Sequence, residues 1–264
     1  MPDPSLVIAV ANQKGGVGKT TTSVNLAASL ATAEQRTLLV DVDPQANASS
    51  GVGVRPRTVE VGLYDALTGR VPLTEAVMRT EIELLDLVPA TQDLVGVDFE
   101  LVDAPDRAER LRSALAPLAG QYRYTILDCP PSLGLLTLNA LVAAEQVLVP
   151  LQCEYYALEG LTQLMATIDR VKAVYNEELT VAGIVLTMFD SRCSLTHQVA
   201  DEVRGHFHVF DAVIPRNVRL SEAPSHGQPA LLYDVNCKGA QGYLSLAREI
   251  IDRDRAEPAA GAPA

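Results

Sequence analysis

LVIAVANQKGGVGKTTT, residues 6–22, joins a short apolar run to a glycine-rich loop and an alanine-rich segment. The run 6–11 is typical of a strand buried on both faces, and 20–32 has the composition of a helix. Glycines let backbone N–H groups approach anionic oxygens, and a helix N-terminus adds partial positive charge. The alternative is a glycine-rich turn with an ordinary surface lysine. The strand, loop and helix order favours a phosphate-binding loop in an α/β fold.

The rest of the chain repeats the alternation of apolar runs and helical segments. Further strands are expected at 37–42, 83–89, 124–129, 146–151, 182–188 and 211–215, and further helices at 106–119, 133–144, 158–175, 195–206 and 239–253. This order predicts a single-domain, doubly wound, mostly parallel twisted sheet with helices on both faces. We expect the domain to span 1–253. The Pro-, Ala- and Gly-rich end, 254–264, is expected to be a disordered tail.

Composition narrows the class of protein. With 264 residues and 48% apolar residues, the chain can bury one sizeable core. A formal charge of −12 argues against a globally basic nucleic-acid binder but leaves a local basic patch open. Four widely spaced cysteines suggest neither a disulfide framework nor a metal site, and fit a reducing cytoplasm. No apolar run approaches the length of a membrane span, and the first residues lack the features of a signal peptide.

Within the loop, each residue type has a chemical reason. Lys19 is placed to reach the β and γ phosphates of a nucleotide, and the Thr20 hydroxyl to hold Mg²⁺. Gln13 stands where the standard pattern has glycine, and Lys14 is an additional lysine, which spacing alone would assign to a solvated loop position. The expected nucleotide contacts here are Lys14, Gly15, Gly16, Val17, Gly18, Lys19, Thr20 and Thr21.

Acidic residues follow two of the expected strands. Asp41 and Asp43 come after 37–42, and Asp128 ends the apolar run of TILDCPPS. Because the carboxyl ends of parallel strands meet at one sheet edge, these side chains can serve a ligand there. Asp128 has the form of a carboxylate that binds Mg²⁺ through water. The alternative is a strand-end aspartate in a turn before two prolines.

These motifs resemble the ParA/MinD family of P-loop ATPases, whose loops carry a second, signature lysine. The matching strings are KGGVGKT, DVDPQ, LDCPP, GIVLTMFDSR and VIPRNVRLSEAPSHGQP, and the likeness is strongest to the chromosome-partitioning ParA/Soj branch. The resemblance implies that Lys14 crosses a face-to-face dimer and touches the partner's ATP, as an arginine finger does. It implies that Asp43 orients or deprotonates the attacking water, with Lys14, Lys19 and Asp43 as the catalytic set. Thr20, Asp43 and Asp128 would hold magnesium, and Asp41 would help to shape that site.

The same resemblance assigns the last two strings to nucleoside and DNA contacts. Pro215, Arg216 and Asn217 would close over the adenine, with Met188 also at the nucleotide. Arg192 and Arg219 would contact DNA phosphates, with Arg216 and Lys238 as further candidates. For each cation, a solvated surface role is the alternative. Dimerisation would double a weak patch, and sequence-independent binding requires only a few phosphate contacts.

The resemblance therefore implies a slow, Mg²⁺-dependent ATPase that uses ATP and ADP in DNA partitioning. An ATP-bound homodimer would bind double-stranded DNA without sequence preference, and a ParB-type centromere-binding partner would stimulate hydrolysis and release. We expect a cytoplasmic, nucleoid-associated protein without membrane contact, and without base readout because no helix-turn-helix precedes Leu6. Two alternatives are a MinD-like membrane-associated division-site regulator and an electron-transfer ATPase resembling the nitrogenase iron protein. The former requires a basic amphipathic end, which SLAREIIDRDRAEPAAGAPA does not supply, and the latter requires a cysteine pair at recognisable motifs.

Overall fold

An eight-stranded sheet forms the centre of the molecule in a computed structural model that describes residues 5–256. Its strand order is β3-β4-β2-β5-β1-β6-β7-β8, and all neighbours are parallel except the antiparallel pair β3–β4. The strands are β1 (Leu6–Val10), β2 (Thr37–Asp41), β3 (Met78–Arg79), β4 (Leu85–Val88), β5 (Tyr124–Asp128), β6 (Gln146–Gln152), β7 (Thr180–Phe189) and β8 (Val209–Pro215).

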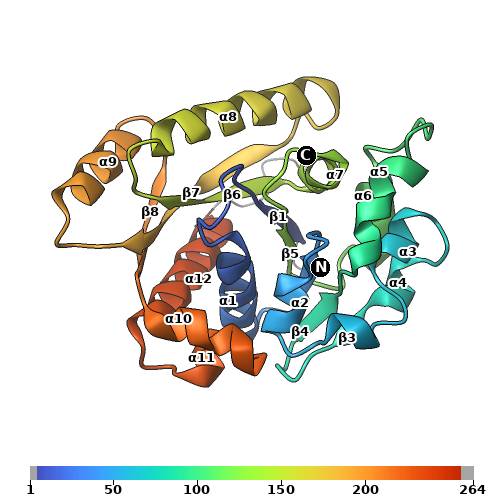
Figure 1. Ribbon diagram of the computed structural model, residues 1–264, viewed down its shortest axis with the longest axis horizontal. Helices are drawn as coiled ribbons and strands as arrows, with labels where there is room; N and C mark the ends of the chain where they lie inside the picture. Colours follow the sequence, from blue (N-terminus) through green and yellow to red (C-terminus); the bar gives the residue numbers. More distant parts are fainter. Residues whose placement is uncertain (1–4, 257–264) are drawn as a thin grey trace.

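Helices cover both faces of the sheet (Figure 1). Alternate residues of β1 point to opposite sides, since Ile8 and Val10 join one buried cluster and Ala9 joins the other. The first cluster packs under α1 and α12, and the second under α6, α7, α8 and α9. The helices are α1 (Lys19–Thr32), α2 (Asn47–Gly51), α3 (Leu63–Leu67), α4 (Leu73–Ala76), α5 (Val97–Glu100), α6 (Arg110–Leu115), α7 (Leu135–Ala143), α8 (Ala157–Val174), α9 (Ser194–Arg204), α10 (Val218–Glu222), α11 (Ala230–Tyr233) and α12 (Lys238–Ala256).

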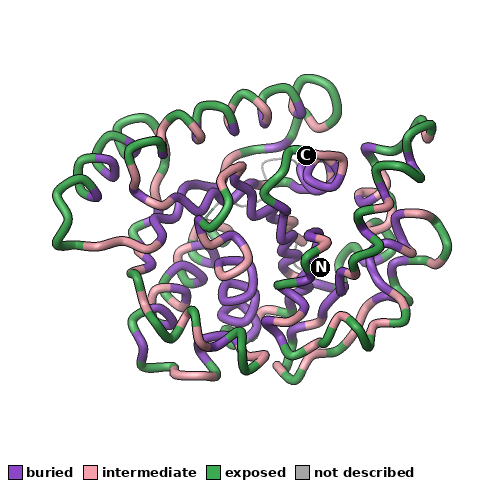
Figure 2. Tube along the Cα trace, viewed as in Figure 1, coloured by how far each residue is buried: buried purple, intermediate pink, exposed green. Residues whose placement is uncertain are grey.

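Burial follows these layers (Figure 2). The central strands and much of α1 are buried, whereas the outward sides of α8 and α9 are exposed. Such two-sided burial explains why the central strands read as nearly continuous apolar runs. None of the helices within residues 5–256 combines the length and the apolar character required to cross a bilayer.

Strand register brings the acidic residues together. Asp41 is the register partner of Asp128 across β2 and β5, and Asp128 is also aligned with Val10 at the end of β1. The glycine loop leaves β1 at the same edge, so the loop and the carboxylates converge at the carboxyl ends of three adjacent strands. This is where open α/β sheets bind ligands.

The predicted fold class is confirmed, with differences at the edges. The sequence analysis missed the two-residue edge strand β3 and the short helices α2 to α5 and α10 to α11. The expected helix 106–119 is shorter, because α6 begins at Arg110 and passes into a 3-10 turn at Ala116–Leu118. Helix α12 continues to Ala256, three residues into the segment expected to be a tail, and the rest of that segment, 257–264, lies outside the described residues.

Candidate nucleotide site

The glycine loop is held open by its backbone conformation. Gly16 and Gly18 have φ angles of 77° and 89°, in the left-handed region that favours glycine, and Gly18 is the N-cap of α1. The loop is also fastened to the sheet, because the Thr187 hydroxyl donates to the Val17 carbonyl at 2.8 Å. At the start of the loop, the Asn12 amide donates to the Pro150 carbonyl of β6 at 2.8 Å. The α1 N-terminus is thereby preorganised for an anion.

Lys19 lies inside this loop. Lys19 is only 7% exposed, and its Nζ donates to the Lys14 carbonyl at 3.0 Å. Burial lowers the pKa of Lys19, while the carboxylates of Asp128 and Asp43 oppose that shift. A buried ammonium group among carboxylates and loop carbonyls is suited to binding phosphate oxygens.

Asp128 is fully buried at the end of β5. Its Oδ1 accepts a hydrogen bond from the Ser23 hydroxyl at 2.7 Å, and its Oδ2 accepts none of standard geometry. Burial, together with the neighbouring Asp41, raises the pKa of Asp128 to about 8, although hydrogen bonds from the hydroxyls of Ser23 and Thr20 oppose the shift. A buried carboxylate oxygen without a partner, close to the Thr20 hydroxyl, fits a magnesium ion or its bound water.

Asp41 has a different role from Asp128, although the two are register partners. Its Oδ2 accepts two hydrogen bonds from Ser49, from the backbone N–H and the hydroxyl, each at 2.7 Å. The Ser49 hydroxyl in turn accepts from the Ala90 N–H at 3.1 Å. Burial raises the pKa of Asp41 to about 6, and the hydrogen bonds from Ser49 oppose this. Asp41 therefore fastens β2 to α2, and both of its carboxylate oxygens already accept hydrogen bonds within the protein.

Asp43 belongs to the same site and is also buried, at 8% exposed. Its Oδ1 accepts from the Gln45 N–H at 3.0 Å, and its carbonyl accepts from the Ala46 N–H at 2.9 Å. Ala46 has a φ of 52°, an uncommon value for a residue with a side chain. This tight turn fixes the carboxylate of Asp43 close to Lys19, a position from which it can orient a water molecule.

Lys14 has a side-chain partner outside the phosphate loop. Its ammonium group forms an ion pair with Glu154, which lies between β6 and α8. The side chains of Lys14 and Glu154 are 41% and 45% exposed, so this pair lies at the surface. Sequence reasoning missed Glu154, since it is 140 residues from Lys14 and lies in no phosphate-loop pattern.

Of the expected nucleoside contacts, Met188 lies beside the phosphate loop and Asn217 begins α10. Met188 has a φ of 49°. Its terminal methyl group lies close to Gly18, since a Cβ placed on Gly18 would be 4.0 Å from that methyl group. The side-chain oxygen of Asn217 accepts from the Arg219 N–H at 2.8 Å as the N-cap of α10. A cavity of about 440 Å³ touches Thr20 and Thr21 and is lined on its far side by Ala223, Pro224, Ser225 and Gln228. Sequence reasoning missed Ser225 and Gln228, although both stand in the SEAPSHGQP string that it singled out.

The expected DNA-contacting cations gather where β7 and β8 end. Arg192 follows β7, and the Arg216 N–H donates to the Phe189 carbonyl at 3.4 Å. Lys238 begins α12, and its neighbour Gly239 packs against Leu220 of α10, next to Arg219. The structure thus brings all four cations to one edge of the sheet.

Two of these cations have carboxylate partners. Arg192 forms a bidentate ion pair with Asp190, in which Nε and Nη2 donate to the two carboxylate oxygens at 3.0 and 3.1 Å. Arg219 pairs with Glu222 at 2.7 Å and with Asp234 at 3.5 Å, and lies over the Tyr233 ring. The Arg192 guanidinium lowers the pKa of Asp190 to about 2. Acidic side chains therefore compete locally with any bound phosphate.

The remaining reactive side chains do not form a second site. Within residues 5–256, no group of three or more His, Cys, Asp or Glu residues could hold a metal ion on its own. All four cysteines are free thiols, and burial raises the pKa of Cys129 far above its usual value, with Asp128 adding to the shift. Magnesium suits the nucleotide site nevertheless, because it binds through one or two protein oxygens together with phosphates and water.

Comparison with known proteins agrees with this geometry. The AAA domain family matches residues 5–181. The chain is 59% identical to the chromosome partitioning protein ParA of Myxococcus xanthus over 250 residues, which cover 94% of this chain and 88% of that protein. The chain belongs to the ParA family of P-loop ATPases. The predicted family is therefore confirmed.

The ParA family chain is similar in structure to solved proteins that contain a bound nucleotide. A cobyrinic acid a,c-diamide synthase from Mycobacterium smegmatis, solved with an ATP analogue and magnesium, is 37% identical with a TM-score of 0.87, covering 96% of this chain and 97% of that one. The septum site-determining protein MinD from Pyrococcus horikoshii, complexed with Mg-ADP, is 25% identical with a TM-score of 0.80, covering 97% and 99%. At 59% identity, the likeness to ParA is much stronger than the likeness to MinD.

Proposed function

We propose that this chain is a DNA-partitioning ATPase that uses ATP to switch between a monomer and a sandwich homodimer. The observation that carries the proposal is the position of Lys14. Its ammonium group lies on the phosphate loop but is half-exposed and paired with Glu154, whereas Lys19 is buried inside the loop. An exposed cation at this edge can exchange Glu154 for phosphate oxygens of a second subunit, which would couple nucleotide binding to dimerisation.

The other site residues divide the work of hydrolysis. The loop N–H groups of residues 15–21 bind the phosphates, and Lys19 neutralises their charge. Thr20 and Asp128 would hold magnesium, with Asp43 at its outer side; when bound, magnesium neutralises charge on the phosphates. Asp43, fixed by its turn, orients the attacking water and accepts its proton. Met188, Pro215, Arg216 and Asn217 surround the base.

DNA binding would follow from dimerisation. Each subunit contributes one edge carrying Arg192, Arg216, Arg219 and Lys238, and two weak cationic edges in a dimer act as one bivalent surface. A ParB-type protein would stimulate hydrolysis and so release the dimer from DNA. The protein would then act in the cytoplasm, on the nucleoid.

A MinD-like role on the membrane is the second candidate, and α12 argues against it. Its apolar residues Ile250 and Ile251 are 5% and 8% exposed and pack in the core under the sheet. A helix that lies on a bilayer requires its apolar side to be available. ATP-dependent sedimentation with liposomes would favour this candidate.

One experiment tests the proposal directly. Gel filtration and fluorescence anisotropy with a labelled 30-base-pair duplex compare the protein without nucleotide, with ADP and with ATP. We expect the dimer and DNA binding to appear together, only with ATP and magnesium. Equal DNA binding in all three states would contradict the proposal.

Two variants test the stimulated hydrolysis and the DNA binding of the proposed function separately. Lys14→Ala is expected to bind ATP like the wild type but to show no stimulated hydrolysis, because the partner phosphates lose their second cation. Arg219→Glu is expected to weaken DNA binding about 10-fold and to leave ATP turnover in place, since it removes one phosphate contact and adds repulsion. An unchanged salt-dependent affinity would remove Arg219 from the DNA interface.

A further inference from the structure

The loop that follows α2 carries two arginines without carboxylate partners. Residues 44–59 contain Arg55 and Arg57 and no aspartate or glutamate. Both arginines are exposed, and neither forms an ion pair within residues 5–256. Arg192 and Arg219, in contrast, each pair with a carboxylate. Arg55 and Arg57 are therefore available to an anion outside the chain.

A tight turn fixes the backbone of this loop. Pro56 stands between the two arginines and begins a 3-10 turn. The Arg55 carbonyl accepts hydrogen bonds from both the N–H and the hydroxyl of Thr58, each at 2.9 Å. On the preceding side, the Val54 N–H donates to the Ser49 carbonyl of α2 at 3.0 Å. Because the loop is already ordered, a ligand that binds there immobilises side chains only.

Two glycines join this loop to the cationic edge at the ends of β7 and β8. Gly53 and Gly227 have φ angles of 90° and 65°, and a Cβ placed on Gly227 would lie 3.0 Å from the Gly53 Cα, so only glycine allows this approach. His226 stacks on the Tyr233 ring with 5.0 Å between the centroids, and the Arg219 guanidinium lies 5.8 Å from the centroid of the same ring. Gly53, His226 and Arg219 are all exposed, so the loop and Arg219 share one surface.

The dimensions of a nucleic-acid duplex fit this surface. Arg55 lies two residues beyond Gly53, at most about 7 Å away along the chain. Double-stranded DNA carries one negative charge per about 1.7 Å of its axis, and one helical turn spans about 34 Å. A duplex that contacts Arg219 therefore has further phosphates at the distance of the loop. Phosphate contacts read no base sequence, which agrees with the proposed binding without sequence preference.

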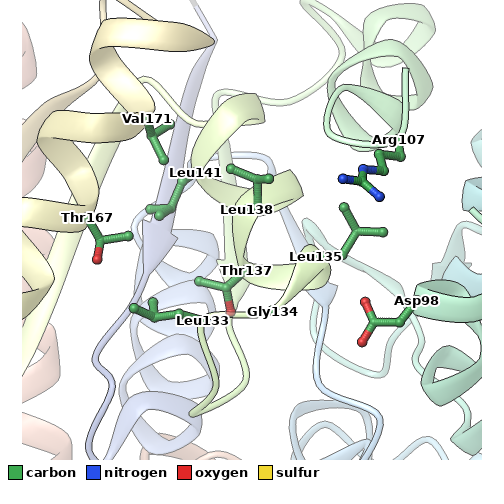
Figure 3. A pocket seen from close by; sticks show the side chains of 10 residues that line it. All are labelled: Asp98, Arg107, Leu133, Gly134, Leu135, Thr137, Leu138, Leu141, Thr167 and Val171. Carbon is green, nitrogen blue, oxygen red and sulfur yellow. The ribbon is translucent and has the colours of Figure 1, made fainter. Parts of the chain in front are cut away.

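The other face of the sheet, which α6 to α9 cover, has the opposite charge pattern. A groove of about 360 Å³ crosses α7 there, and Asp98 and Arg107 lie on one side of it (Figure 3). The neighbouring residues 92–106 contain five carboxylates and no lysine or arginine. Like charges repel, so this segment disfavours a polyanion. The net charge of −12 is therefore unevenly distributed, and it leaves the loop after α2 locally cationic.

We propose that Arg55 and Arg57 are a second phosphate-contacting element, which binds the same DNA duplex as the edge around Arg219. The proposal rests on the proposed function, because that function supplies the duplex and the ATP-bound dimer. Each subunit adds two cations, so the dimer gains four phosphate contacts. Since these cations have no carboxylate to displace, each contact forms without breaking an ion pair within the described part of the chain.

The test uses the full-length chain with ATP, magnesium and a labelled 30-base-pair duplex as the probe. Fluorescence anisotropy measures the affinity across a salt series for the wild type, the double variant Arg55→Gln/Arg57→Gln and the control Arg170→Gln. Arg170 is also exposed but lies on α8, away from α10 and α11 (Figure 1). We expect the double variant to bind at least about 10-fold more weakly, with a log–log salt slope shallower by about 3 to 4, because each dimer loses four phosphate contacts. The control should stay within about twofold of the wild type, since it removes no phosphate contact.

A charge-preserving variant separates charge from structure. Arg55→Lys/Arg57→Lys keeps both cations and should retain the wild-type salt slope and an affinity within about threefold. If this variant binds as weakly as Arg55→Gln/Arg57→Gln, the loop acts through its structure, and the proposal is overturned. Thermal unfolding checks that the variants fold, and gel filtration with ATP checks that they form dimers. Loss of the dimer in the glutamine variant would place the arginines in the subunit interface, which also overturns the proposal.

The wild type distinguishes failure of this proposal from failure of the proposed function. If the wild type binds the duplex only with ATP, and the glutamine variant has the same affinity and salt slope, the second element is wrong while the function stands. If the wild type binds the duplex in no nucleotide state, both fail. Vesicles of phosphatidylserine and phosphatidylcholine are the second probe. ATP-dependent sedimentation that requires Arg55 and Arg57, with no effect of these residues on the duplex, would assign the surface to a membrane and overturn the proposal.

Discussion

The nucleotide site and the cationic region at the ends of β7 and β8 differ in how far their charged side chains are buried. Where β1, β2 and β5 end, Asp41 and Asp128 are fully buried and Lys19 is 7% exposed. Where β7 and β8 end, the side chains of Arg192 and Arg219 are 88% and 50% exposed. Each buried charge has a fixed hydrogen-bond partner inside the fold, whereas the exposed arginines pair with carboxylates at the surface.

This difference sets how strongly each region responds to a substitution. A buried charged group that loses a partner remains desolvated, so single changes there have large effects. Exposed ion pairs are screened by water and salt, so single changes there are small and depend on ionic strength. The nucleotide end is therefore built for fixed geometry, and the cationic end for reversible binding.

The largest effect is expected from Lys19→Ala. This change removes the buried ammonium group of the loop, and nucleotide affinity should fall by roughly 100-fold or more, corresponding to about 3 kcal/mol. Calorimetric titration with ATP and magnesium measures it. Lys172→Ala, on α8, is the control and should bind as the wild type does. Comparable ATP affinity in Lys19→Ala would show that the loop N–H groups suffice.

Two substitutions of Asp43 distinguish its role in the turn from the role of its negative charge. Asp43→Ala should retain ATP binding and ATP-dependent dimers but lower the turnover by roughly 100-fold, because no carboxylate orients the water. Asp43→Asn keeps an oxygen for the Gln45 N–H and so preserves the turn. If the carboxylate itself acts on water, both variants should be equally slow in a phosphate-release assay. Rapid turnover in Asp43→Asn would assign the residue a purely structural role.

Ser49 tests the buried network behind the site. Ser49→Ala leaves Asp41 Oδ2 without its hydroxyl donor and the Ala90 N–H without an acceptor. We expect the free energy of unfolding to fall by about 2 kcal/mol, as measured by urea denaturation. Ser50→Ala is the matched control, since the Ser50 hydroxyl donates only to the Ala46 carbonyl within its own helix turn. Equal losses for the two variants would mean that the network adds no stability.

Local patterns predicted much of the nucleotide end. The strand, loop and helix order of 6–32 and the aspartates after two apolar runs all depend on short stretches of chain. Their convergence at one edge follows from parallel pairing alone. The structure agrees in the placement of Lys19, Thr20, Asp43 and Asp128 at this edge.

Contacts between distant segments escaped prediction. Ser23 reaches Asp128 across 105 residues and Glu154 reaches Lys14 across 140, and neither pairing leaves a periodic or compositional signal. The hydrogen bonds from Ser49 to Asp41 were missed for another reason, since the two residues are only eight apart: Ser49 belongs to α2, a helix of five residues that no periodic pattern predicts. Short helices and the two-residue strand β3 are fixed by tertiary contacts rather than by propensity.

The smallest expected effect lies at the exposed end, in Asp190→Asn. The carboxylate of Asp190 occupies both Nε and Nη2 of Arg192, the same groups that would bind a DNA phosphate. Replacing it with an amide should raise the affinity of the ATP-bound dimer for DNA a few-fold and steepen its salt dependence, because each Arg192 gains a phosphate contact. Asp201→Asn, which affects a comparable exposed pair with Arg204 on α9, is the control and should change neither quantity. If Asp190→Asn leaves both the affinity and the salt slope unchanged, Arg192 lies outside the DNA interface, and the cationic surface narrows to Arg216, Arg219 and Lys238.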